Sequence, residues 1–63
     1  MKLSGRKLTL IAFDRDITLS DVARAAGVSR QTLYGIKSGR KCSEATAQKI
    51  AKALNVAVEY LQE

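Results

Sequence analysis

Apolar residues recur along this chain at helical spacing, in short runs that are separated by turn-forming residues. The first run extends from Ser4 or Gly5 to about Asp14. Its inward stripe consists of Leu8, Ile11 and Ala12. Leu10 and Phe13 fall on the opposite side, and we expect Phe13 to fold beneath the N-terminal tail rather than to form a partner surface.

Two further runs, separated by a glycine, form the centre of the chain. Thr18 is a suitable N-cap for the first, because its hydroxyl can accept from the amide of Asp21, whose carboxylate can return the bond. Gly27 ends that helix, since glycine adopts a left-handed conformation at least cost. Ser29 caps the next helix, predicted over about residues 30–38. The inward residues of the two helices are Leu19, Val22, Ala23, Ala26, Leu33 and Ile36.

The last third of the chain predicts two more helices. Ser43 caps the first of them, and Glu44 lies in its first turn, where an acidic residue suits the helix dipole. Its apolar stripe consists of Ala47, Ile50, Ala51 and Leu54. Asn55 fits the left-handed position after the helix, and a short final helix from about Ala57 buries Val58 and Leu61. With no proline and a helical period throughout, residues 1–63 are predicted to form one all-α, five-helix domain.

The amino-acid composition excludes several kinds of functional site. One cysteine (Cys42) and no histidine exclude an internal disulfide and a thiolate-rich zinc site. No nucleophile–base pair and no phosphate-cradling glycine loop is evident, so we expect no enzyme activity, no cofactor and no small-molecule ligand. A lone thiol and the lack of a long apolar run favour a cytoplasmic protein that does not enter a membrane.

Positive charge is concentrated in the middle of the chain. The formal net charge is +5, and residues 22–43 contain five basic side chains and no acidic one. Residues 1–21 contain four basic and three acidic side chains, and residues 44–63 contain two basic and three acidic ones. The whole excess therefore belongs to the central segment, which is the distribution expected of a polyanion-binding face.

The spacing around Gly27 is typical of a helix-turn-helix. Ala23 lies four residues before the glycine and Val28 directly after it, while Leu33 and Ile36 follow at six and nine residues. Small and apolar residues at these positions let two helices cross tightly and leave one side of the second helix polar. Such a second helix enters the DNA major groove. The alternative is a plain helical hairpin in which the glycine only ends a helix.

The segments ITLSDVARAAGVSRQTLYGIKSGR and SEATAQKIAKALNVAVEYL resemble the DNA-binding domain of the Cro/CI (Xre) family of phage and bacterial regulators. The resemblance implies a lambda-repressor-like fold. The central segment is also similar to the headpiece of the LacI family, but there the helix-turn-helix opens the domain, whereas here a helix precedes it. The chain differs from the Cro/CI pattern at Leu19, where that family often has glutamine, and near Ala12, where it often has arginine.

The resemblance also implies which residues touch DNA. The residues expected to approach bases are Ser29, Arg30, Gln31 and Tyr34. The residues expected to contact phosphate are Lys37, Arg40, Lys41 and Ser43, and Ser20 is expected to take over part of the backbone contact that Leu19 and Ala12 do not supply. Gln31 is suited to an adenine edge and Arg30 to a guanine or a phosphate. Gly35 occupies a position where relatives often place another base-reading side chain.

These features predict a sequence-specific regulator of transcription that binds a double-stranded DNA operator, of the phage- or prophage-type repressor or Cro-like kind. Because so small a unit reads about half an operator, we expect a homodimer on DNA. The resemblance suggests pairing through the loop after the second helix of the motif and the end of the fourth helix; Leu10, Phe13 and Tyr60 are other candidates. The alternatives are a protein-interaction module, such as an antitoxin-like subunit, and the headpiece of a longer LacI-like repressor.

Overall fold

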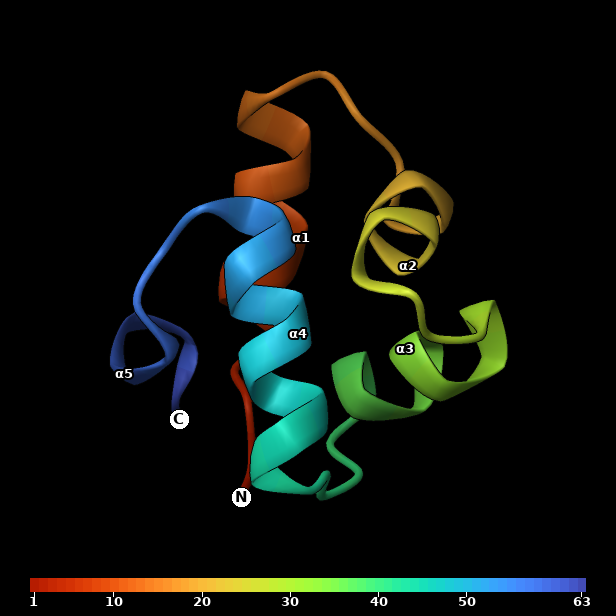
Figure 1. Ribbon diagram of the computed structural model, residues 1–63. Coiled ribbons are helices and arrows are strands. Elements are labelled where there is room, and N and C mark those ends of the chain that lie inside the picture. The colour runs from red at the N-terminus through yellow and green to blue at the C-terminus, as the bar shows by residue number, and fades with distance from the viewer.

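The computed structural model describes residues 1–63 and contains five α-helices around one core (Figure 1). In chain order these are α1 (Gly5–Asp14), α2 (Leu19–Ala26), α3 (Arg30–Lys37), α4 (Glu44–Leu54) and α5 (Val58–Leu61). The all-α, five-helix fold predicted from the sequence is therefore confirmed. The only extended pairing is an isolated antiparallel bridge between Leu3 and Gln62, near the two ends of the chain.

Hydroxyl side chains start the first four helices. The caps are Ser4, Thr18, Ser29 and Ser43, each of which accepts a hydrogen bond from the backbone N–H three residues later. At Thr18 the capping is reciprocal, because the backbone N–H of Thr18 also donates to Oδ2 of Asp21 at 2.9 Å. Hydrogen bonding from Thr18, first from its backbone and then from its side chain, holds the pKa of Asp21 below its ordinary value. The predicted capping box is present.

The same backbone motif ends α1, α2, α3 and α4. Each helix is followed by a residue with positive φ, namely Asp16, Gly27, Gly39 and Asn55. The next residue donates its N–H to the carbonyl five positions back: Ile17 to Ala12, Val28 to Ala23, Arg40 to Gly35 and Val56 to Ala51. This is the Schellman arrangement, which satisfies helix carbonyls and often joins the two residues by an apolar contact. At α1, α2 and α4 the donor is an apolar residue that packs against the core; at α3 the donor is the exposed Arg40.

The core contains 14 buried residues, and all of them are apolar. It includes the predicted inward residues of α4, together with Leu33 and Ile36 of α3. Leu3 is also fully buried, although the sequence did not single it out. The expectation for Phe13 is wrong: its side chain is 78% exposed, because the N-terminal tail runs along α5 instead and does not cover it.

The tail ahead of α1 is held on two sides. On one side, Ser4 donates its N–H to the carbonyl of Leu61 at 2.6 Å, and Glu63 donates to that of Lys2 at 3.0 Å. On the other side, the amide of Cys42 donates to the Met1 carbonyl at 2.8 Å, and the Met1 amine donates to the Cys42 carbonyl at 3.0 Å. The tail thus joins the end of the chain to the loop between α3 and α4.

Helix α4 crosses the centre of Figure 1, with α2 and α3 on one side and α5 on the other. The start of α1 meets the end of α3 so closely that a β-carbon on Gly5 would overlap the carbonyl oxygen of Lys37. The position of α3 is therefore set by α1 and by the tail as well as by α2.

Candidate nucleic-acid interface

Helices α2 and α3 form a helix-turn-helix whose second helix is anchored from beneath. The three residues from Gly27 to Ser29 join them, with Gly27 at φ 74°. Leu33 and Ile36 are 0% and 1% exposed, so the inner side of α3 is fully packed. Ala23, at 3% exposed, offers a small contact surface in α2. Side chains on the outer side of α3 are therefore presented from a fixed base, as major-groove reading requires.

The four residues predicted to approach bases are exposed and lie together at the start and on the outer side of α3. They are Ser29, Arg30, Gln31 and Tyr34. The hydroxyl of Ser29 is already engaged: it accepts from the Thr32 amide at 3.0 Å and donates to Thr32 Oγ1 at 2.7 Å. Ser29 thus keeps one lone pair for an outside donor, whereas Arg30 and Gln31 retain all their donors.

The predicted phosphate contacts lie in two places. Ser20 is in the first turn of α2 and is partly buried. Lys37, Arg40, Lys41 and Ser43 lie at the end of α3 and in the loop that leads to α4, and all four are exposed. The Ser43 hydroxyl caps α4, since it accepts from the Thr46 amide at 3.2 Å and donates to Thr46 Oγ1 at 3.0 Å.

No carboxylate neutralises the cations on and next to α3. The ion pairs of the molecule are Lys2–Glu63 at 3.3 Å and Arg24–Asp21 at 3.6 Å. Arg30, Lys37, Arg40 and Lys41 belong to neither of them. The unpaired positive charge of the central segment is thus brought onto the same part of the surface as the exposed side of α3, which favours a polyanionic partner.

Arg40 occupies a place that the sequence did not predict. Its side chain lies against Gly35, so that a β-carbon on Gly35 would be 3.5 Å from Nη1 of Arg40 and 3.6 Å from Cδ and Cζ. An open hollow of about 450 Å³ is lined there by Gln31, Tyr34, Gly35, Ser38 and Arg40. The structure therefore brings Arg40 next to the residues predicted to approach bases. The available signal was the Gly39-Arg40 ending with Gly35 five residues before the arginine.

The two positions at which the chain differs from the Cro/CI pattern do not face outward. Ala12 is 4% exposed, and Leu19 is partly buried against the core. Neither side chain is available for a phosphate contact, so the surface beside α2 is left to Ser20 and the backbone amides of that helix.

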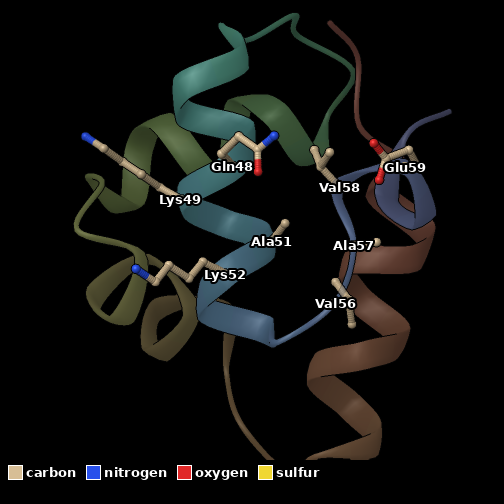
Figure 2. A pocket seen from close by; sticks show the side chains of 8 residues that line it. All are labelled: Gln48, Lys49, Ala51, Lys52, Val56, Ala57, Val58 and Glu59. Carbon is tan, nitrogen blue, oxygen red and sulfur yellow. The ribbon is translucent and has the colours of Figure 1, made fainter.

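A second hollow lies between α4 and the segment that leads into α5 (Figure 2). Val56 and Ala57 border it on one side and Ala51 on the other; Lys49 and Lys52 also line it, and the ends of their side chains extend outward (Figure 2). Its location is the end of the fourth helix, which the sequence resemblance had suggested for pairing of two copies.

Two other features of the chain concern metal ions and membranes. No group of three or more histidine, cysteine, aspartate or glutamate side chains is arranged to hold a metal ion. None of the helices combines the length and the apolar character needed to cross a bilayer.

The fold and the outer side of α3 define a DNA-binding helix-turn-helix regulator. Residues 14–61 match the model of the family described as Helix-turn-helix, and the chain belongs to this Cro/CI-type family. This match confirms the resemblance seen in the sequence, and membership of the family implies double-stranded DNA as the partner. No curated protein and no solved structure was found to match the chain.

Proposed function

We propose that this protein is a sequence-specific regulator of transcription, a phage- or prophage-type repressor or a Cro-like protein, that inserts α3 into the major groove of an operator. The observation that carries the proposal is the two-sided character of α3. Leu33 and Ile36 fix its inner side in the core, and its outer side presents polar side chains beside unpaired cations. Occupying an operator in this way blocks polymerase without catalysis.

In this proposal Gln31 reads an adenine and Arg30 a guanine or a phosphate, with Ser29 and Tyr34 close to the bases. An amide side chain pairs with adenine N6 and N7 through two hydrogen bonds, and a guanidinium pairs with guanine O6 and N7. Ser20, Lys37, Lys41 and Ser43 contact the backbone and set the register of the helix without reading sequence.

Selection of bound duplexes from a random pool tests sequence-specific reading. We expect one enriched motif, and Gln31→Ala should lower affinity for it about 5- to 150-fold and relax the preference at one base pair. Gln62→Ala is the matched control, because Gln62 is an exposed glutamine that follows α5 and is not part of α3 or its loop. Equal affinity for all duplexes by the unaltered protein, or an unchanged motif for Gln31→Ala, would contradict this reading.

Salt dependence tests the phosphate contacts. Lys41→Ala should weaken binding to all duplexes by a similar factor and reduce the slope of log affinity against log salt by about one. Lys7→Ala removes the same charge elsewhere, since Lys7 Nζ is held by the carbonyl of Tyr60 at 2.9 Å on the side of α5. The slope should decrease in Lys41→Ala and stay unchanged in Lys7→Ala. The reverse result would place the DNA on another face.

We further propose that two copies bind a near-palindromic operator, paired through the end of α4 and the segment after it. The hollow bordered by Val56 and Ala57 supports this site, because it is partly apolar and lies between α4 and the segment that leads into α5 (Figure 2). Ala57→Arg places a charge in the interface and should abolish paired occupation of the two half-sites. Phe13→Ser is the control; loss of pairing in that variant alone would move the interface to α1.

A further inference from the structure

The end of α3 places the side chain of Arg40 through backbone geometry. Gly39 has φ 110°, its N–H donates to the carbonyl of Ile36 at 3.0 Å, and that of Arg40 donates to Gly35 at 2.9 Å. This arrangement directs the residue after the positive-φ position back over the residue five places earlier. The loop therefore does not leave the helix directly but first returns Arg40 to its surface.

Comparison with the other helix ends shows what is different at α3. Ile17, Val28 and Val56 occupy the equivalent position after α1, α2 and α4, and all three pack against the core. After α3 the pair of residues is Gly35 and Arg40, and Arg40 is exposed. The same backbone motif that covers the core at three helix ends therefore lays a cation on the outer side of α3.

Gly35 leaves the space in which this cation lies. Atoms Cδ, Cζ and Nη1 of Arg40 all come within 3.5–3.6 Å of the point where a β-carbon of Gly35 would be. A side chain longer than a methyl group at residue 35 would have to displace the guanidinium. The side chain of Arg40, which comes from outside the helix, thus packs on the surface that Gly35 leaves open.

The guanidinium is also unpaired. Arg40 takes part in neither ion pair of the molecule, and it faces the hollow that Gln31, Tyr34 and Ser38 also line. Its donors are therefore directed toward whatever ligand occupies the outer side of α3. A phosphate contact made from the loop would not need the arginine to lie across the helix.

We propose that Arg40 is a specificity-determining residue: packed on Gly35, it reads a guanine in the major groove. The sequence suggested only a phosphate contact for this residue. The proposal rests on the function proposed above. Arginine binds guanine O6 and N7 through two hydrogen bonds, in a plane fixed by its fork of donors. The base pair read by Arg40 then lies close to the one read by Gln31.

Selection from random duplexes separates the two roles of Arg40. Arg40→Ala should lose the preference for guanine at one position of the motif and bind the original operator about 5- to 150-fold more weakly. Lys41→Ala, the neighbouring cation, should select the unaltered motif with uniformly lower affinity. If Arg40→Ala also selects the unaltered motif, whatever its affinity, the proposal is overturned.

Variants of Gly35 test whether Arg40 acts while packed on this residue. Gly35→Leu should displace the guanidinium and remove the same guanine preference, whereas the methyl group of Gly35→Ala fits at ordinary contact distance and should preserve it. Both residues favour a helix more than glycine does, so the variants fold. A Gly35→Leu variant that keeps the guanine preference would show that Arg40 does not act from this position.

An altered base identifies the contact chemically. Replacing the preferred guanine by 7-deazaguanine removes N7, and should weaken binding by the unaltered protein while leaving Arg40→Ala unaffected. Equal losses in both proteins would overturn the proposal. If the unaltered protein enriches no motif at all, the function proposed above fails first, and this outcome is distinct from a retained motif in Arg40→Ala.

Discussion

The contact between α1 and α3 makes Gly5 a sensitive position. Gly5 is the first residue of α1, and a β-carbon there would overlap the carbonyl oxygen of Lys37 and lie 3.0 Å from its carbonyl carbon. The obstacle is backbone rather than the end of a flexible side chain. In Gly5→Ala, therefore, α1 and the end of α3 have to move apart, and part of the buried contact between them is lost.

The expected effect on stability follows from two opposing contributions. Overpacking typically costs about 1–3 kcal/mol. Alanine is favoured over glycine by at most about 1 kcal/mol in a helix, and by less in a first turn whose amides are free. We expect Gly5→Ala to lower the free energy of unfolding by about 1–2 kcal/mol. For a domain of this size, that corresponds to a decrease in Tm of about 5–15 °C.

Gly35→Ala is the matched control. The same methyl group at residue 35 meets only Arg40, at 3.5 Å or more, and lies in the interior of α3. This variant should be more stable than the original chain by up to about 1 kcal/mol. Thermal and urea unfolding followed by circular dichroism at 222 nm measure both changes. A Gly5→Ala variant that melts at or above the temperature of the original chain would refute the close approach of α1 to α3.

Two further predictions concern a helix cap and an exposed side chain. Because the folded-state pKa of Asp21 is lowered, its capping interaction is fully present above the ordinary carboxyl pKa of 3.8 and is lost as the pH falls through the lowered value. Asp21→Asn should flatten the fall in stability below about pH 4, measured by urea unfolding across pH; an unaltered pH profile would contradict the cap. Phe13→Ser should change the free energy of unfolding by less than about 0.5 kcal/mol, because the ring is 78% exposed. A loss of several kcal/mol would mean that Phe13 is covered.

Local chemistry explains why the helix boundaries could be predicted. The hydroxyl caps Thr18, Ser29 and Ser43, and the left-handed residues Gly27 and Asn55, act within a few positions of themselves. Their effect is therefore visible in the sequence. The same holds for the apolar stripes, since helical spacing alone brings those residues to one side.

Features that depend on distant partners were not predictable. Leu3 is buried where the start of the chain pairs with its end, since Leu3 forms the bridge with Gln62 and its neighbour Ser4 is hydrogen-bonded to Leu61. Nothing in the first four residues indicates this pairing. Phe13 was misjudged for the same reason, because its exposure depends on where the tail runs.

The candidate site was predicted in outline but not in detail. Charge and motif spacing located α3 and the basic loop, and the structure places Gln31 and Lys41 on exposed positions there. The position of Arg40 was missed because charge and sequence neighbourhood say only that it lies in a loop. Its return to Gly35 depends on the backbone bond between these two residues.

The hydrogen bonds between Met1 and Cys42 have a practical consequence for experiments on this protein. A purification tag fused ahead of Met1 would replace the amine that donates to Cys42 at 3.0 Å and would add chain next to Arg40 and Lys41. Affinities measured with such a fusion would combine the behaviour of the tag with that of the basic loop. A tag joined after Glu63 leaves both hydrogen bonds between Met1 and Cys42 in place, and it starts beside α5 (Figure 1).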